Sequence, residues 1–114
     1  MKKHYRVRNT KDFTRIIHQG TALKSNALVL YYTCNTEHLR VGIAVSKKVG
    51  NAVTRNKIKR QLRAIFTHYT RRLSNRDIVV VVRKNYLDHS YEQITTLVDQ
   101  LLDKMEKNIN EEEK

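Results

Sequence analysis

Three basic side chains lie at intervals of four residues in the middle of the chain: Arg55, Lys59 and Arg63. If this segment is helical, the i, i+4, i+8 spacing places them in one row, about 6 Å apart, close to the spacing of successive phosphates along a nucleic acid strand. Guanidinium groups bind phosphate in a bidentate manner and stack on unpaired bases. We therefore predict that this row follows the backbone of a nucleic acid.

Neighbouring polar residues are predicted to extend this surface. Arg60 falls in the same arc of the helix, and Asn56, inside the arc, can both donate and accept towards a base edge or a ribose 2′-hydroxyl. Upstream, Lys47, Lys48 and Asn51 lie at a strand-to-helix junction, where free backbone N–H groups and the helix dipole favour an anion. The segment lacks the G-x-x-x-x-G-K-[ST] spacing of a phosphate-binding loop, so nucleotide hydrolysis is not supported.

The charge of the chain is segregated as well as high. Residues 38–76 contain 11 of the 23 Lys and Arg residues and no Asp or Glu. Residues 1–76 carry 18 basic and 2 acidic side chains (+16), whereas residues 77–114 carry 5 basic and 9 acidic ones (−4), which together give the net +12. A solvated helix face is the alternative explanation of the basic row, but such a face normally includes acidic residues. The one-sided block favours a polyanionic partner.

The first predicted element is a helix over about residues 10–19. Asn9 or Thr10 can cap its N-terminus, and apolar residues recur within it at helical spacing. Gly20 stands where a helix often ends in a left-handed cap.

Two strands are predicted next, over 27–34 and 39–46, and we expect them to pair as a hairpin. In the second strand, large apolar residues alternate with small or polar ones such as Gly42 and Ala44. One face is therefore predicted to pack against a core, while the other carries small side chains. The uninterrupted apolar run 78–82 is typical of a strand covered on both faces and is predicted to be central.

Two further helices complete the pattern. One begins after the capping residue Asn51 and runs over about 52–70, with the apolar stripe of Ile58, Leu62, Ile65, Phe66 and Tyr69. The other begins with a capping box formed by Ser90 and Gln93. Residues 107–114 are expected to be a frayed, charged tail.

This order of elements predicts a single α+β domain over residues 1–114, a two-layer α-β sandwich in which three helices cover a small sheet. If the strands flanking the 52–70 helix are parallel, the general rule predicts a right-handed crossover. The chain has no run of about 18 apolar residues and no apolar segment typical of a signal peptide, so we predict a cytoplasmic protein with no membrane partner.

No constellation of catalytic side chains is evident. The five histidines lie in different elements, and none forms an H-x-x-x-H pair. Asp12 and Glu37 are the only acids in the basic region, too few for two-metal hydrolysis of a phosphodiester. We therefore predict no catalytic and no metal-binding residues, which disfavours a free-standing ribonuclease. A ribosomal or general structured-RNA-binding protein remains an alternative that the charge supports equally.

The segment VGIAVSKKVGNAVTRNKIKRQLR resembles the signature of the protein components of bacterial ribonuclease P. The residues that match the arginine-rich helix motif of this family are Arg55, Asn56, Lys59, Arg60 and Arg63. TKDFTRIIHQG and ALVLYYT resemble the family's opening helix and first strand, so the resemblance covers nearly the whole chain. It implies an α-β sandwich with a mixed sheet, similar to a domain of ribosomal protein S5, and a left-handed crossover.

The resemblance also implies a function. The arginine-rich helix would face a catalytic RNA that binds Mg²⁺ and performs the cleavage, while the protein, itself without a cofactor, assists the endonucleolytic removal of the 5′ leader of precursor tRNA. The excess positive charge would offset the repulsion between the two RNAs in this ribonucleoprotein.

The family further implies a cleft between the first helix and the sheet that holds the leader. Phe13, Ile17 and Tyr31 match positions that face this cleft, and Gly42 and Ala44 leave room for a chain to approach. Tyr31 is the strongest candidate, because a phenol can stack and form a hydrogen bond at once. For Phe13 and Ile17, a purely structural role in the core is an equal alternative.

Overall fold

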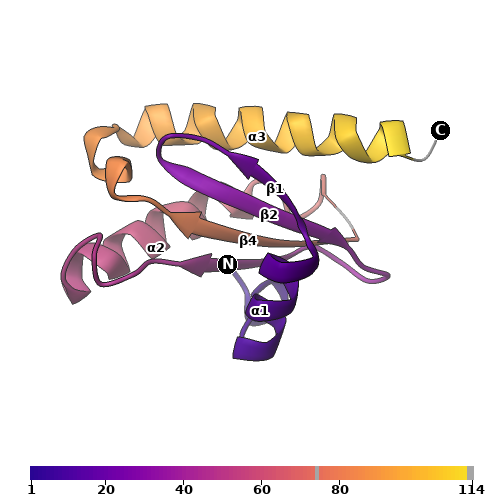
Figure 1. Cartoon of the computed structure of the whole chain (residues 1–114), viewed down its shortest axis with the longest axis horizontal. Helices are drawn as coiled ribbons and strands as arrows, with labels where there is room; N and C mark the ends of the chain where they lie inside the picture. Colours follow the sequence, from indigo (N-terminus) through magenta and orange to yellow (C-terminus); the bar gives the residue numbers. More distant parts are fainter. Residues whose placement is uncertain (74, 113–114) are drawn as a thin grey trace.

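The computed structural model describes residues 1–73 and 75–112 and contains a mixed sheet with helices on both faces. Its elements are η1 (Lys3–Tyr5), α1 (Thr10–Gln19), β1 (Thr21–Lys24), β2 (Leu28–Cys34), β3 (Arg40–Ala44), α2 (Ala52–Thr67), β4 (Arg76–Val82), η2 (Lys84–Asp88) and α3 (Tyr91–Glu112). Figure 1 shows α3 along one side of the sheet and α1 on the other. The predicted α+β class, with its helices around a small mixed sheet, is confirmed.

The strands lie in the order β1-β2-β4-β3, so the predicted hairpin between the second and third strands is wrong. β4 lies between them, antiparallel to β2 and parallel to β3. The reason is burial: β4 is apolar on both faces and takes the interior position that was predicted for it, which separates β2 from β3. The connection 35–39 passes the start of β4, where the backbone N–H of Asn35 donates to the carbonyl of Asn75 at 2.9 Å.

β1 is a strand that the sequence pattern did not predict. It pairs antiparallel with β2 along the full length Thr21–Lys24. Ser25 closes the turn between them, because its hydroxyl donates to the carbonyl of Leu28 at 2.7 Å. Only Leu23 of this strand is buried, so its hydrophobic pattern is too short to be recognised.

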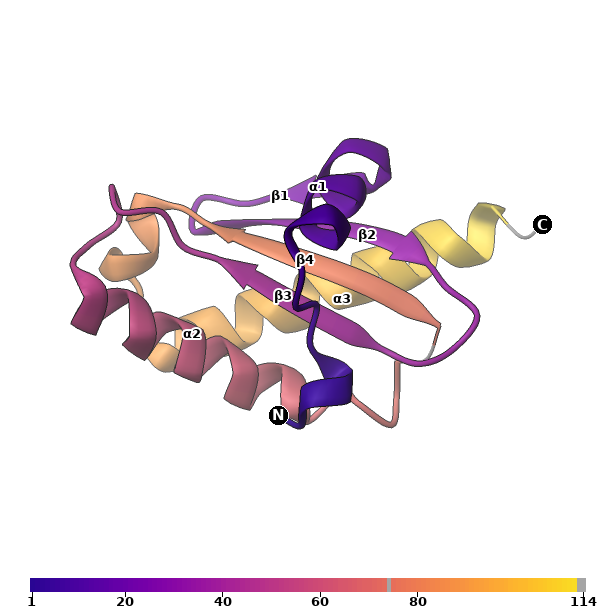
Figure 2. The same ribbon diagram turned by 90° about the horizontal axis from the view of Figure 1, so that it is seen from below.

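The passage from β3 through α2 to β4 is left-handed. The two strands run in the same direction in Figure 2, where the sheet is seen from the side of α1. The buried side chains of α2 belong to the same core cluster as those of α3, on the far side of the sheet. With α2 on that side, the step from β3 to β4 has the hand that the family resemblance implied, against the usual right-handed rule.

The two faces of β4 serve different layers. Ile78, Val80 and Val82 are buried in the main core, together with the apolar faces of α2 and α3. Val79 forms a smaller cluster on the opposite face with Ile16 of α1 and with Val7. The predicted stripe of α2 is confirmed, since Ile58, Leu62, Ile65 and Phe66 are all buried, with Tyr69 packed against them just beyond the end of the helix.

The helix caps follow the sequence closely. The side chains of Asn9 and Asn51 accept hydrogen bonds, at 2.8 and 2.9 Å, from backbone N–H groups three residues further along. Ser90 and Gln93 form the predicted capping box, each side chain accepting from the other's backbone N–H. These contacts fix where each helix begins, and therefore which side chains α2 directs outward.

Gly20 does not form the left-handed cap predicted for it, because its φ is −78°. A glycine is required at this position because the backbone of α1 and that of β2 leave no room for a side chain. A Cβ atom at this position would lie 2.3 Å from the carbonyl oxygen of Ile16 and 2.8 Å from that of Tyr32. The end of α1 is thus pressed directly against β2.

The expectation of a frayed tail over 107–114 is wrong for residues 107–112. α3 continues to Glu112, and Ile109 is only 2% exposed within the main core. The apolar spacing of the helix therefore continues one turn further than the acidic composition suggested; residues 113–114 lie outside the described residues. None of the described helices is both long and apolar enough to cross a membrane.

The carboxylate of Asp77 joins several elements at one end of the sheet. It is 1% exposed and accepts hydrogen bonds from Nε and Nη2 of Arg40 at 2.9 and 3.0 Å. Arg15 of α1 donates to it at 3.0 Å and Asn35 at 2.7 Å. Asp12 lies 3.5 Å from both arginines. One buried acid on β4 therefore fixes α1, β3 and the 35–39 connection in place.

The charge state of Asp77 follows from these contacts. Burial by itself would raise the pKa of its carboxyl, but the hydrogen bonds from Arg40, Asn35 and Arg15 outweigh burial and hold the pKa below its ordinary value. A carboxyl whose pKa is lower in the folded than in the unfolded state stabilises the fold above the unfolded value, about 4. That stabilisation is lost as the pH falls through the folded value.

We predict that Asp77→Asn lowers the free energy of unfolding by about 3 kcal/mol at pH 7, because it leaves two partly exposed arginines, Arg15 and Arg40, without their buried counter-charge. Urea unfolding at pH 7 measures this loss, with Asp88→Asn on the exposed turn η2 as the matched control, expected within about 0.5 kcal/mol of wild type. The difference between Asp77→Asn and wild type should narrow below about pH 4. Equal stability at pH 7 would contradict the anchoring role.

Candidate nucleic-acid interface

The basic residues of α2 lie beside and opposite its buried stripe, as predicted. Arg55, Lys59 and Arg63 are half-buried, whereas Asn56 and Arg60 are exposed. Most of them line one shallow groove of about 430 Å³, which we call the α2 groove. Its lining residues are Met1, Arg6, Asn56, Lys59, Arg60, Arg63 and Ala64. The structure therefore brings four of the five predicted helix residues into one groove and leaves Arg55 beside it.

The arginines of the molecule fall into two groups according to whether a carboxylate lies beside them. Arg15, Arg40, Arg72 and Arg76 each lie within 3.5 Å of an Asp or Glu oxygen. Among residues 1–73 and 75–112, by contrast, no basic side chain of α2 lies within 4.0 Å of a carboxylate. The paired arginines hold the fold together, and those of α2 have no such partner.

The environment of α2 makes this positive charge unfavourable in the protein alone. The first turn of α2 contains no acidic residue, so nothing there offsets the positive end of the helix dipole. The Nε atom of Arg55 is buried without a hydrogen-bond acceptor. Partial burial, followed by the positive charge of Arg6, lowers the pKa of Arg63. A bound anion would relieve each of these costs.

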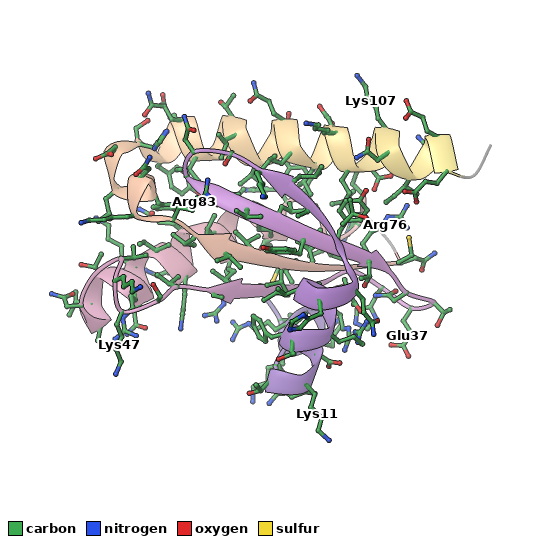
Figure 3. All side chains as sticks on the ribbon, in the orientation of Figure 1. Lys11, Glu37, Lys47, Arg76, Arg83 and Lys107 are labelled. Carbon is green, nitrogen blue, oxygen red and sulfur yellow. The ribbon has the colours of Figure 1, made fainter. Side chains whose placement is uncertain are left out.

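The strand-to-helix junction is placed differently from the α2 groove. Lys47 and Lys48 are exposed in the turn before α2 and line neither this groove nor the one described next. Figure 3 shows Lys47 directed away from the body of the protein. The side chain of Asn51 accepts the backbone N–H of Thr54, so it serves as the helix cap.

A second groove of about 410 Å³ lies between α1 and the end of the sheet, and we call it the α1 groove. It is lined by Phe13, Ile43, Ala44, Val45, Ser46, Lys59, Val81 and Val82. Lys59 lines both grooves, so the two surfaces meet at this side chain. The α1 groove is thus largely apolar with a cation at one end, an arrangement that suits unpaired bases followed by a phosphate.

The residues predicted to face a cleft are gathered on the α1 side of the sheet. Phe13, Ile17 and Tyr31 are half-buried and pack against the small cluster around Val79. Of these, Phe13 lines the α1 groove together with Ala44, whereas Ile17 and Tyr31 lie in the adjoining packing.

Gly42 allows the ring of Phe13, on α1, to approach the sheet closely. A Cβ atom at Gly42 would lie 2.6 Å from Cζ of Phe13, so any larger residue would displace the ring. On the face of β3 that was predicted to carry small side chains, the Phe13 ring covers Gly42. Ala44, two residues further along the same face, lines the α1 groove.

Arg6 is a groove residue that the sequence reasoning missed. It lies some fifty positions from α2 in the chain, yet it lines the α2 groove beside Arg63. The backbone N–H of Val7 donates to the carbonyl of Val41 at 3.0 Å, which holds this segment along the edge of β3. The basic N-terminus was visible in the sequence, but nothing there indicated which element it would touch.

Within the described residues, no group of three or more His, Cys, Asp or Glu side chains is placed to hold a metal ion. Asp12 and Asp77 are engaged with Arg15 and Arg40.

Comparison with known proteins gives a consistent result. The family model for ribonuclease P matches residues 1–106. A ribonuclease P protein component of Streptococcus thermophilus is 44% identical over 95 residues, covering 82% of this chain and 86% of the relative. The structure of the Staphylococcus aureus RNase P protein has a TM-score of 0.80 and 38% identity, covering 87% and 93%. That of the Thermotoga maritima RNase P protein has a TM-score of 0.76 and 31% identity, covering 85% and 94%.

We predict that Arg60→Met and Arg63→Met, which keep the apolar stems, leave the free energy of unfolding within about 0.5 kcal/mol of wild type or raise it, because the lost charges have no partner in the fold. Leu62→Ala, between them on the buried stripe, should lower it by about 2–5 kcal/mol. Chemical denaturation compares the three variants. A loss for either arginine as large as that for Leu62 would mean that the arginines are structural.

Proposed function

This chain belongs to the ribonuclease P protein family, and from that premise we propose that it is the RNA-binding accessory subunit of a bacterial ribonuclease P. In this role the α2 groove binds the catalytic RNA and the α1 side of the sheet receives the 5′ leader of precursor tRNA. The product of the assembled ribonucleoprotein is the mature 5′ end of the tRNA. We place this activity in the cytoplasm.

The observation that carries the proposal is the row of cations on α2 without carboxylate partners among the described residues. Four arginines outside α2, Arg15, Arg40, Arg72 and Arg76, are paired with carboxylates, whereas the cations of α2 are available to an external anion. Binding of two RNAs to each other is opposed by phosphate repulsion, and cations that replace condensed counterions offset it. A protein with this surface between the catalytic RNA and its substrate would strengthen their association.

The leader is proposed to run across the α1 groove. Unpaired nucleotides bind proteins through stacking on aromatic rings together with phosphate contacts. Phe13 provides an aromatic ring to the groove, and the small side chain of Ala44 leaves room for a nucleotide. Lys59 provides a cation where this groove meets the α2 groove. Tyr31, half-buried on the same face, offers a second ring and a hydroxyl.

We further propose that the RNA subunit performs the hydrolysis with bound Mg²⁺, and that the protein supplies no catalytic residue. What the chain's own residues contribute is binding: cations along α2 for structured RNA, and a narrow apolar groove for a single strand. A general structured-RNA-binding role would use the same cations but has no need of the α1 groove. Preference for a substrate with a leader therefore separates the two functions.

The experiment uses holoenzyme reconstituted from the protein and its cognate RNA subunit, with affinity measured for precursor and for mature tRNA. We predict that wild-type protein favours precursor tRNA, and that Tyr31→Ala reduces this preference by roughly 5- to 100-fold, the equivalent of one lost base stack of about 1–3 kcal/mol. Mature tRNA has no leader, so its affinity should not change.

Two controls sharpen this result. Tyr91→Ala removes an exposed ring from α3, on the opposite side of the sheet, and should leave the preference intact. Protein without the RNA subunit should not cleave precursor tRNA. Equal weakening of both substrates by Tyr31→Ala would place this residue outside the leader path. Wild-type protein that binds both tRNAs equally would favour the general RNA-binding function.

A further inference from the structure

The N-terminal segment, residues 1–7, is built into the structure beside α2. Arg6 forms an isolated parallel bridge with Val41, and Val7 donates a backbone hydrogen bond to the same residue. His38 extends this attachment, because its Nε2 lies 2.6 Å from the carbonyl oxygen of His4. The rings of His4 and His38 also meet edge to face, with centroids 5.3 Å apart. The segment thus lies along the free edge of β3, and Arg6 has a defined position.

Arg6, from the N-terminal segment, and Arg63, from α2, line the same α2 groove. The Nε atom of Arg6 is buried without any hydrogen-bond acceptor. Among residues 1–73 and 75–112, no carboxylate lies within 4.0 Å of either guanidinium. Partial burial, and after it the positive charge of Arg6, lowers the pKa of Arg63. Two guanidinium groups that line one groove without a carboxylate beside them suit the oxygens of a phosphate group.

We propose that Arg6 and Arg63 together bind one phosphate group of the RNA backbone, so that the N-terminal segment forms a second wall of the RNA site. This inference rests on the proposed function and adds to it a contact from outside the arginine-rich helix. The phosphate is a phosphodiester of the RNA subunit, because structured RNA is the partner proposed for α2. Lys59 and Arg60, in the same groove, are left for neighbouring phosphates.

The surface beyond Arg63 supports a site that includes this segment. A further groove of about 290 Å³ adjoins the first at Met1 and is lined by Met1, Lys2, Tyr5, Thr67, Thr70 and Arg71. Like the α2 groove, it contains basic side chains and no acidic one among its lining residues. The basic surface therefore continues past the end of α2, with the N-terminal segment as one side of both grooves.

The test measures affinity for the cognate RNA subunit as a function of salt for Arg6→Met, Arg63→Met and the double variant. Each single change should weaken binding roughly 10- to 100-fold and reduce the magnitude of the slope of log K against log salt by about 1. Because both side chains hold the same phosphate, the double variant should lose much less than the product of the two single losses. Arg6→Lys should restore the salt slope but only part of the affinity.

Arg8→Met is the matched control, since Arg8 is exposed two residues further along and lines neither groove. It should bind nearly as wild type does. Thermal unfolding of each variant verifies that the fold is retained, as the backbone contacts to Val41 do not involve the Arg6 side chain. The proposal of a shared phosphate would be overturned if Arg6→Met bound the RNA subunit as tightly as Arg8→Met does. It would also be overturned if the loss of affinity in the double variant equalled the product of the two single losses.

A second measurement keeps this inference separate from the proposed function. Titration of the free protein with inorganic phosphate should shift the Nε–H NMR signals of Arg6 and Arg63 together, and that of Arg8 much less. Wild-type protein that fails to bind the RNA subunit would contradict the proposed function, while unchanged Nε–H signals would contradict the Arg6–Arg63 site. Weakened binding by Arg60→Met with none by Arg6→Met would overturn the inference alone.

Discussion

The buried carboxylate of Asp77 is the contact on which the arrangement of both grooves depends. It receives hydrogen bonds from α1, from β3 and from the connection between β2 and β3, all at the end of the central strand. α1 in turn carries Phe13, which covers Gly42 and forms the wall of the α1 groove. An ion pair with a buried carboxylate contributes less to net stability than its contacts suggest, but it strongly disfavours arrangements in which that carboxylate is left alone. Its effect here is to fix where α1 sits on the sheet.

The charge segregation visible in the sequence has a structural explanation. Two acids of α3 pair with arginines of other segments: Asp103 with Arg72 in the loop after α2, and Glu106 with Arg76 at the start of β4. Asp99 of α3 accepts a hydrogen bond from the Tyr69 hydroxyl, and burial together with this contact raises the pKa of that tyrosine to about 12. These three carboxylates of α3 thus join it to β4 and to the segment after α2. The outer face of α2 has none beside it among the described residues, which leaves its cations for an external anion.

The sequence predicted those parts of the fold that depend on local patterns. Helix caps at Asn9, Asn51 and Ser90, the apolar stripe of α2 and the central position of β4 all rest on spacing within a short window, and all are confirmed. The hairpin between β2 and β3 was wrong because pairing is decided by which strand needs cover on both faces, a competition among distant segments. Asp77 was overlooked for the same reason, since Arg15 and Arg40 are far away in the chain. Gly20 was misread because its glycine is required by packing against β2 and not by a local left-handed cap.

The candidate site shows the same division. The row on α2 could be predicted because a helix brings i, i+4 and i+8 residues together by its own geometry. The Arg6 contact could not, because it depends on the N-terminal segment lying along β3. The roles of Phe13, Ile17 and Tyr31 remain predictions from family resemblance. The structure places them together on one face of the sheet, partly exposed and packed against the small cluster, which does not distinguish a binding role from a packing role.

The central claim is that the unpaired cations of α2 bind RNA through its phosphates. The most direct test is the salt dependence of the affinity of wild-type protein for its RNA subunit. About 6 to 8 phosphate contacts on structured RNA predict a slope of log K against log salt of about −4 to −7. Replacing Arg55, Arg60 and Arg63 with Gln should reduce its magnitude by about 2 to 3. A wild-type slope near −1, or a slope that the triple replacement does not change, would contradict the account.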